Sequence, residues 1–390
     1  MLNPQKLDAV LLNPLTGMIA FLLLFWLIFE ITYLLSSPLI EMMKAATMLL
    51  GSLVYLTFSD SQFPLWIAEI AKKGIVDGVG SVMAFLPSIF ILFVLVYALE
   101  ESGVLARFSA LAQRMAGRFG LTGSFAFPFV LGLGCNVPAI MCAKTLGKKE
   151  KVATVIAIPF ISCSARLPIY LLFAGTFFSE NQPIVILLLY LMGIISAIAT
   201  FWLFKNLLFA ESKSKTDILL PNYRPPRLSS VFSKATMQTR AFVRKAGGVI
   251  LVVSVIVWAL TYPEGTESIG RKIGELAAPI FEPLGFGKWQ PALSLLLGLA
   301  AKEAVIGGLV GAYSIQNGLL SDVIASDFSP ASAFSFMVFV LLYTPCAPAL
   351  AILHKECGTK MALLATAYYF VFAWAAAFMA YHAGAAIIGS

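Results

Sequence analysis

Four short stretches place helix-breaking residues and polar side chains inside otherwise apolar sequence. They read Gly-Leu-Gly-Cys-Asn-Val-Pro at 132–138, Pro-Phe-Ile-Ser-Cys-Ser-Ala-Arg-Leu-Pro at 159–168, Ala-Lys-Glu at 301–303 and Tyr-Thr-Pro-Cys-Ala-Pro at 343–348. Gly and Pro interrupt a helix and free backbone carbonyl groups. In lipid, such backbone is tolerated only where protein buries it or where it lines a water-filled cavity. The four stretches therefore predict a polar path through an apolar protein.

The side chains of these stretches suit a borderline divalent metal ion. The candidate ligands combine thiols, hydroxyls, an amide and a carboxylate: Cys135, Asn136, Ser162, Cys163, Ser164, Glu303 and Cys346. Such a mixed set fits Fe²⁺ better than Mg²⁺ or Ca²⁺, which take oxygen ligands. A transport site must also release its ion, so a few mixed ligands suit it better than a closed four-cysteine cage. Mn²⁺ stays open as a cargo that this set would hold more weakly.

The five cysteines differ in their settings. A single buried cysteine is usually a small apolar residue, but Cys135, Cys163 and Cys346 each stand beside a proline in a predicted helix break. That repeated placement favours a shared role on the path. Cys142 and Cys357 lack it and are interpreted as packing residues. No pair has CxxC spacing, which argues against a disulfide framework or a structural zinc site.

Four charged residues are candidates for controlling access to the path. Lys302 and Glu303 interrupt an apolar segment, where ionisable groups are expensive and indicate function. We assign Lys302 a gating role. Glu100 and Glu101 follow a predicted span and are interpreted as an ion entrance or exit, with plain interfacial charges as the equal alternative.

The composition identifies the solvent of this chain as lipid. Apolar residues make up 59% of its 390 residues and charged residues 12%, with a mean hydropathy of +0.89. A soluble domain carries about 25% charged residues. The net charge of +7 is concentrated at 144–151 and 213–245, which is typical of cytoplasmic loops rather than of nucleic-acid binding. We expect lipid, and no nucleic acid, as a partner.

The order of apolar segments predicts an all-α polytopic membrane protein. Spans are expected at 18–35, 82–99, 152–177, 184–209, 246–262, 333–353 and 361–388, and interrupted segments at 122–143 and 289–313. Amphipathic helices are expected at 104–118, with Arg107, Arg114 and Arg118 on the polar side, and at 267–282. The stretch 36–80, broken at Pro38 and Pro64, is interpreted as interfacial or re-entrant.

The two halves of the chain read as repeats. Residues 131–140 align with 297–306 at an offset of 166, and Cys163 aligns with Cys346 at an offset of 183. We therefore expect an N-terminal helix with an interfacial segment at 1–80, a first repeat at 81–209, a basic cytoplasmic linker at 210–243 and a second repeat at 244–390. If the interrupted segments enter the membrane and return to the same side, the repeats are inverted, which is a common transporter plan. If these segments cross the membrane completely, the repeats are parallel.

The motifs resemble those of one known family. The stretches 134–140, 159–168, 299–303 and 341–346 resemble the two Gate motifs of FeoB ferrous iron transporters, and Leu-Glu-Glu-Ser-Gly at 99–103 resembles the acidic turn of that family. The resemblance covers nearly the whole chain. It implies Fe²⁺ import across the bacterial inner membrane by a multi-pass protein, with Cys135, Cys163 and Cys346 on the ion path. It implies Fe²⁺ as transported substrate and no permanently bound cofactor.

The chain departs from the FeoB pattern in one respect. Members of that family normally begin with a GTPase domain, whereas these residues contain neither GxxxxGK[ST] nor GxGxxG and are not expected to form an enzyme. A separate GTPase protein, a cut from a longer chain, and transport without GTP are all open. A homo-oligomer is a further candidate partner. The rivals are a nucleoside-like solute transporter of the wider Gate superfamily and a non-transporting scaffold.

Overall fold

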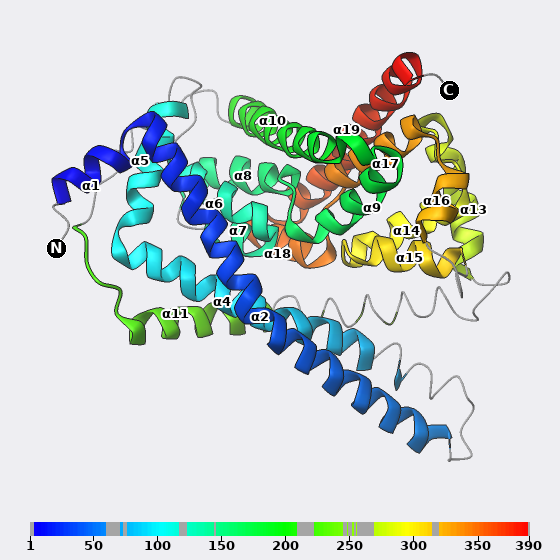
Figure 1. Cartoon of the computed structure of the whole chain (residues 1–390), viewed down its shortest axis with the longest axis horizontal. Coiled ribbons are helices and arrows are strands. Elements are labelled where there is room, and N and C mark those ends of the chain that lie inside the picture. Colours follow the sequence, from blue (N-terminus) through cyan, green and yellow to red (C-terminus); the bar gives the residue numbers. More distant parts are fainter. Residues whose placement is uncertain are drawn as a thin grey trace. The chain divides into compact units, whose positions relative to one another are not determined.

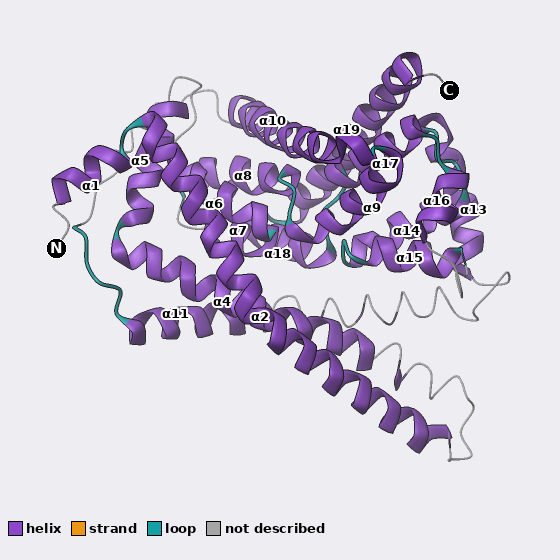
Figure 2. Ribbon diagram, in the orientation of Figure 1, coloured by secondary structure: helices purple, strands orange, loops and turns teal. Residues whose placement is uncertain are grey.

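The structure, a computed structural model, describes residues 4–59, 71–72, 76–116, 123–143, 146–208, 222–244, 248, 252, 255, 269–313 and 320–388. All regular elements in these ranges are helices, as Figures 1 and 2 show. The prediction of an all-α protein is confirmed. The chain forms two compact units: unit 1 comprises Met1–Val130 and Asn206–Val255, and unit 2 comprises Leu131–Lys205 and Ile256–Ser390.

Unit 1 is built around two long helices. Its helices are α1 (Pro4–Leu11), α2 (Pro14–Ser59), α4 (Asp77–Ser102), α5 (Val104–Ala116) and α11 (Leu228–Phe242), and α6 (Gly123–Gly134) begins in it. Helix α2 packs along α4, and α11 packs on α4. The chain turns from α4 into α5 at Gly103, whose φ of 78° is the left-handed conformation that glycine adopts without a steric penalty.

One expectation about unit 1 is wrong, and the structure adds a helix to another segment. Helix α2 continues through Pro38, so the predicted break there is wrong. Proline removes one helical hydrogen bond, but in an apolar sequence every other backbone group still gains by bonding within the helix. The segment read as a linker contains α11, whose buried residues Val231, Ala235 and Phe242 recur at helical spacing. The many charged residues around them obscured this stripe in the sequence.

Unit 2 holds most of the helices. They are α7 (Asn136–Cys142), α8 (Lys148–Ala157), α9 (Leu167–Phe177), α10 (Gln182–Leu208), α13 (Ile269–Phe281), α14 (Trp289–Ala300), α15 (Ala304–Ala312), α16 (Leu320–Asp327), α17 (Pro330–Leu342), α18 (Ala347–Cys357) and α19 (Thr359–Ile388). Helix α17 lies at the centre and packs against α9 and α19. From Phe336 to Leu342 every residue of α17 is buried.

Five stretches of the described residues are long and apolar enough to cross a membrane. They are Pro14–Thr57, Glu150–Phe177, Ser179–Leu207, Pro330–Cys357 and Thr359–Ala386. They overlap the spans expected at 18–35, 152–177, 184–209, 333–353 and 361–388, but the first continues through residues 36–57, so the interfacial or re-entrant interpretation of that part is wrong. The span expected at 82–99 lies within α4, and that expected at 246–262 lies almost wholly outside the described residues. The chain is therefore a multi-pass membrane protein.

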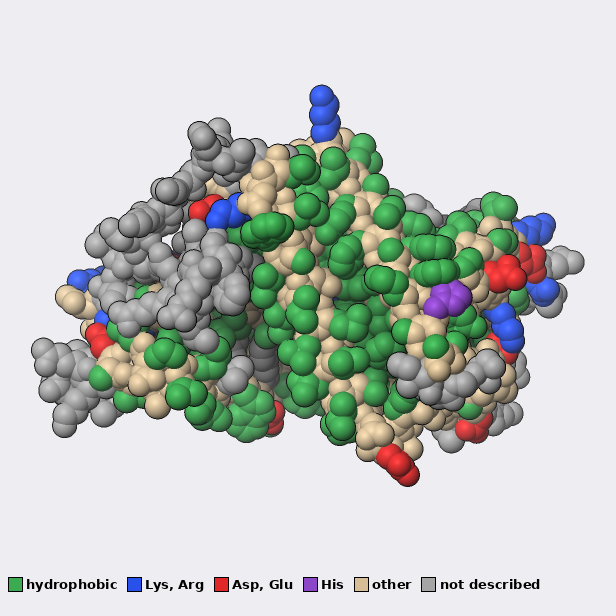
Figure 3. Space-filling model, turned by 90° about the horizontal axis from the view of Figure 1, so that it is seen from above, with side chains coloured by type: hydrophobic (Ala, Val, Ile, Leu, Met, Phe, Trp, Pro, Cys, Tyr) green, Lys and Arg blue, Asp and Glu red, His purple; other side chains and the backbone are tan. Residues whose placement is uncertain are grey.

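The outer faces of α10 and α19 are apolar. In Figure 3 hydrophobic side chains cover these helices over a broad face with few charged groups among them. The exposed large apolar residues of these two helices include Leu187, Leu191, Ile195, Trp202, Leu364 and Val371. Such a surface is stable next to lipid, because lipid chains are as apolar as the side chains that meet them.

Candidate functional site

The first and third predicted breaks have the same backbone shape. Cys135 is extended between α6 and α7, with φ −153° and ψ 128°. Ala301 is extended between α14 and α15, with φ −149° and ψ 139°. The two residues are partners at the offset of 166. The expected interruptions of 122–143 and 289–313 are thus confirmed.

The second and fourth breaks form another matched pair. Cys163 has φ −82° and ψ 161°, and Cys346 has φ −60° and ψ 155°. Each precedes a turn of helix that carries a proline in or just after its first turn. The spans expected at 152–177 and 333–353 are consequently each two helices rather than one, because the prolines that unwind them cannot donate a helical hydrogen bond.

The four breaks lie together within unit 2. Helix α18 packs against α7, α8 and α14, so it contacts elements from the other three breaks. The Ser164 hydroxyl donates to the Gly134 carbonyl at 2.9 Å, which joins the second break to the first. The thiols of Cys135, Cys163 and Cys346 interact electrostatically with one another. The structure thus brings the four helix breaks together, while the shared path of their side chains stays a prediction.

The predicted ligands differ in exposure. Asn136, Ser162 and Cys163 are buried. Cys135, Cys346 and Glu303 are half-buried, and Ser164 is exposed. Within the described part of the chain, no group of three or more His, Cys, Asp or Glu side chains could hold one metal ion together. A single ion position among these residues therefore needs amide, hydroxyl or backbone oxygens beside the thiols.

Asn136 supplies a free acceptor at the first break. Its Oδ1 atom is buried and accepts no hydrogen bond. A Cβ atom placed on Gly132 would lie 3.6 Å from this oxygen, so the glycine leaves space beside it. A buried carbonyl oxygen without a donor costs free energy, and such a group calls for an explanation by a ligand, an ion or strain.

Lys302 is buried at the third break and reaches the fourth. Its Nζ donates to the Thr344 carbonyl at 2.6 Å and stands 3.2 Å from the ring centroid of Tyr343. The side chain is 2% exposed. Lys302 therefore has a carbonyl oxygen and an aromatic face as partners.

Arg166 is a buried charge that the sequence analysis missed. It is 0% exposed, and its Nη1 donates to the carbonyls of Pro159 and Ile161, both at 3.1 Å. Its Nε and Nη2 atoms are buried without a hydrogen-bond partner. An arginine inside a predicted span is as costly as Lys302. The same rule that selected Lys302 could therefore have selected Arg166.

The acidic pair predicted as an ion entrance or exit divides into two different settings in unit 1. Glu101 accepts hydrogen bonds from the Arg227 backbone amide and the Ser230 hydroxyl, and forms an ion pair with Lys234 at 3.2 Å. The Ser230 hydroxyl is the largest cause of a lowered pKa at Glu101. These contacts place a carboxylate at the start of α11, where the helix dipole favours negative charge. Glu100 is exposed.

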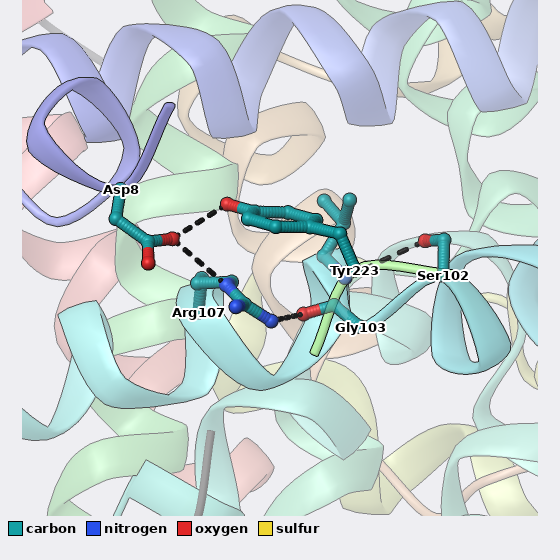
Figure 4. Close-up of polar contacts among 6 residues, drawn as sticks. Asp8, Ser102, Gly103, Arg107 and Tyr223 are labelled. Atoms are coloured by element: carbon teal, nitrogen blue, oxygen red, sulfur yellow. Dashed lines mark hydrogen bonds and ion pairs between the residues drawn. The ribbon is translucent and has the colours of Figure 1, made fainter. Parts of the chain in front are cut away.

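A second charged cluster of unit 1 surrounds Arg107 (Figure 4). Its guanidinium donates to Asp8 at 2.9 Å and to the Gly103 carbonyl at 2.8 Å, and lies 3.8 Å from the ring centroid of Tyr223. Tyr223 donates its hydroxyl proton to Asp8 at 2.6 Å. Arg107 is 4% exposed, so its expected place on the polar side of a helix is wrong. Its partners come from distant parts of the sequence, which local periodicity cannot reveal.

Comparisons with known proteins agree with the Gate motifs. A family model described as "Gate: Nucleoside recognition" matches residues 82–177 and 243–360. A second model, described as "Ferrous iron transport protein B C terminus", matches residues 186–237. No solved structure matches the chain significantly.

Three curated relatives of this chain have names that include FeoB. The Fe(2+) transporter FeoB of Staphylococcus aureus is 36% identical over 97% of this chain, and that of Methanocaldococcus jannaschii is 36% identical over 96%. A Porphyromonas gingivalis protein named as a fusion of Fe(2+) transport protein A and FeoB is 32% identical over 97%. The chain spans 59%, 58% and 51% of these relatives, respectively.

Proposed function

This chain belongs to the Gate family and resembles FeoB transporters along almost its whole length, and we propose on that premise that it is a ferrous iron permease. Fe²⁺ is its transported substrate, with no permanently bound cofactor. Its compartment is the bacterial inner membrane, in keeping with five long apolar stretches. The observation that carries the proposal is the meeting of four unwound helix ends inside unit 2, three of which carry a cysteine.

The proposed path runs along the four breaks. The thiols of Cys135, Cys163 and Cys346 offer soft ligands, and the unpartnered oxygen of Asn136 offers a hard one. Ser162, Ser164 and Glu303 add oxygens near them. Unwound backbone replaces part of the water that a divalent ion loses on entering lipid, as broken helices do in other transporters. Because thiol and oxygen ligands are mixed, the ion is held loosely enough to leave.

We also propose the two Gate repeats at 81–209 and 244–390, after an N-terminal region at 1–80 and joined by the linker 210–243. The matched backbone angles at Cys135 and Ala301 support an internal duplication. So do those at Cys163 and Cys346. The basic linker is proposed to lie in the cytoplasm, following the positive-inside rule, and the repeats are proposed to be inverted.

A GTPase protein is the proposed partner, because the curated relatives are longer than this chain. The basic linker is its proposed docking segment. We propose lipid contacts over α10 and α19, and a homo-oligomer as a further assembly. Glu100 and Glu101 keep their proposed role at the ion entrance or exit, although the bonds of Glu101 to α11 favour a helix-capping role for that residue.

Nucleoside transport is the weaker alternative, favoured by the description of the Gate model alone. A nucleoside site needs several amide or carboxylate groups that converge on a base and a sugar. The side chains at the breaks are three thiols and two hydroxyls, with one amide and one carboxylate. Thiols bind soft and borderline metals, so the metal permease explains the residues better. Mn²⁺ is the competing metal cargo.

Uptake by the purified chain in proteoliposomes tests the proposal. Anaerobic Fe²⁺ uptake is measured without nucleotide, and again with a candidate GTPase protein and GTP. A variant with Cys135, Cys163 and Cys346 all changed to Ser is expected to lose uptake. The matched control changes Cys142 and Cys357 to Ser, which lie off the proposed path, and is expected to keep it.

Competition separates the candidate cargoes. Unlabelled Mn²⁺ is expected to compete more weakly than Fe²⁺, and nucleosides not at all. Full uptake by the triple variant contradicts the placement of the path. Nucleoside uptake without metal uptake contradicts the proposed substrate.

A further inference from the structure

Two buried cations bind equivalent carbonyl groups in the two halves of unit 2. Arg166 donates to the carbonyl of Ile161, and Lys302 donates to the carbonyl of Thr344. Ile161 and Thr344 are partners at the offset of 183, and each stands two residues before a path cysteine. The sequence does not reveal this correspondence, since Arg166 and Lys302 do not themselves align.

The Thr344 carbonyl is a natural ligand for a passing cation. It belongs to the unwound stretch before Cys346, where backbone oxygens are not committed to a helix. The Lys302 ammonium occupies it at 2.6 Å and rests on the face of Tyr343. A carbonyl oxygen and an aromatic face are both attractive to a cation, so the lysine fills a position that chemistry would give to a metal ion.

We propose that Lys302 is a tethered cation that holds the ion position at the Thr344 carbonyl and gives it up when the transported metal arrives. The inference rests on the proposed metal permease. Electrostatics supply the reason for exchange, because the buried Lys302 charge is repelled by the Arg166 guanidinium and also interacts with the Cys346 and Cys163 thiols and with Glu303. A divalent ion at that carbonyl repels the ammonium and binds the same thiols more strongly than a single charge does.

Arg166 is the fixed counterpart of Lys302. It forms two hydrogen bonds with the carbonyls of Pro159 and Ile161, is fully buried, and carries a rigid planar group. Lys302 makes one hydrogen bond at the end of a flexible four-carbon chain. Its neighbour Glu303 is half-buried and offers a partner for the displaced ammonium. Arg166 therefore binds the carbonyls of the second break permanently, whereas the Lys302 ammonium at the fourth break can move away from the carbonyl that it binds.

Cobalt binding tests this exchange without relying on transport. Co²⁺ is titrated into the purified chain in detergent, and the thiolate-to-cobalt absorption band reports its affinity for the path cysteines. Lys302→Gln keeps a hydrogen-bond donor but removes the charge, and is expected to bind Co²⁺ at least about tenfold more tightly. Lys272→Gln, at an exposed position of α13, is the matched control and is expected to leave the affinity unchanged.

The outcomes separate this inference from the proposed function. If the wild-type chain shows no thiolate band, the metal path fails and the inference fails with it. If the wild-type band appears but Lys302→Gln does not tighten binding, only the tethered-cation role is overturned.

Lys302→Arg decides the matter if the Gln variant does not fold. The larger guanidinium of this variant stays at the Thr344 carbonyl and moves away from it less readily than the lysine ammonium does. The Co²⁺ affinity is therefore expected to fall about fivefold. An unchanged affinity in that variant contradicts the inference.

Discussion

The two units treat buried charge in opposite ways. In unit 1 the Arg107 guanidinium has a carboxylate, a carbonyl and an aromatic ring as partners. In unit 2 the Arg166 guanidinium has only carbonyl partners, and two of its nitrogens have none. A satisfied network fixes a structure, whereas a buried donor without an acceptor calls for an explanation of its own. The comparison teaches that burial of charge alone does not mark a functional site; the state of its partners does.

The largest expected difference comes from removing each arginine. Arg166→Met leaves the carbonyls of Pro159 and Ile161 without a donor inside unit 2, and Fe²⁺ uptake is expected to be lost. Arg107→Met removes the donor to the Gly103 carbonyl as well as the ion pair with Asp8, and is expected to lower the free energy of unfolding by about 3 kcal/mol. The fraction of the Arg107→Met variant that still folds is expected to take up Fe²⁺ with the wild-type KM.

Uptake kinetics and thermal stability in detergent check this pair. The conservative changes Arg166→Lys and Arg107→Lys serve as controls, because each keeps the charge but loses the planar fork. Equal loss of transport in Arg107→Met and Arg166→Met at equal amounts of folded protein would remove the distinction between the units.

A pair of glycines sharpens the comparison inside unit 2. A Cβ atom at Gly193 would lie 2.7 Å from the Phe160 carbonyl oxygen, closer than packing allows, so Gly193→Ala must push α10 away from the second break. A Cβ atom at Gly132 meets ordinary contacts at 3.5 Å and 3.6 Å. Gly132→Ala is therefore expected to fold normally but to fill the space beside the Asn136 oxygen, lowering uptake several-fold.

Thermal stability and uptake are measured on both glycine variants. Gly193→Ala is expected to lose about 2 kcal/mol of stability through the overpacking it forces. Normal stability with reduced uptake in Gly132→Ala would tie Asn136 to the path. If Gly132→Ala transports at the wild-type rate, the free oxygen of Asn136 has no part in conduction.

The helix breaks could be predicted from the sequence because their causes are local. Gly134, Pro138 and Pro345 stand at or within three residues of the interruptions, whereas Pro38 lies inside the continuous helix α2, so a proline marks a break only together with the polar residues beside it. Burial and partners depend on the tertiary fold instead. The contact of Arg107 with Asp8 joins residues 99 positions apart, and that of Tyr223 with Asp8 joins residues 215 apart. No periodicity in a helix carries such information.

Glu101 shows a different limit of the sequence analysis. Its position after a predicted span fits an ion entrance, a bare interfacial charge or a helix cap equally well. The structure adds the contacts that distinguish them, because its partners Arg227, Ser230 and Lys234 all lie at the start of α11 or within it. That helix was hidden in a segment whose composition resembles a linker.

A smaller effect is expected from Asp8→Asn. The change keeps the shape of the side chain but removes the charge that Arg107 and Tyr223 share. Because Asp8 is partly exposed, solvent screens the pair, and stability is expected to fall by about 1 kcal/mol. Uptake is expected to stay unchanged, since the cluster belongs to unit 1. Thermal stability and KM for Fe²⁺ are measured together, and a changed KM would contradict a purely structural role.

The smallest expected effect is the pH dependence of that same cluster. The hydrogen bond from Tyr223, followed by the contacts with Arg107, lowers the pKa of Asp8 from its usual value of 3.8. A carboxyl group with a depressed pKa stabilises the fold fully above its unfolded-state pKa and loses that contribution as the pH falls through the folded-state value. The stability difference between wild type and Asp8→Asn is thus expected to be constant from about pH 7 to pH 5 and to shrink below about pH 4. Thermal melts over this range measure it, and a difference that grows on acidification would show that Asp8 is not held ionised by Tyr223 and Arg107.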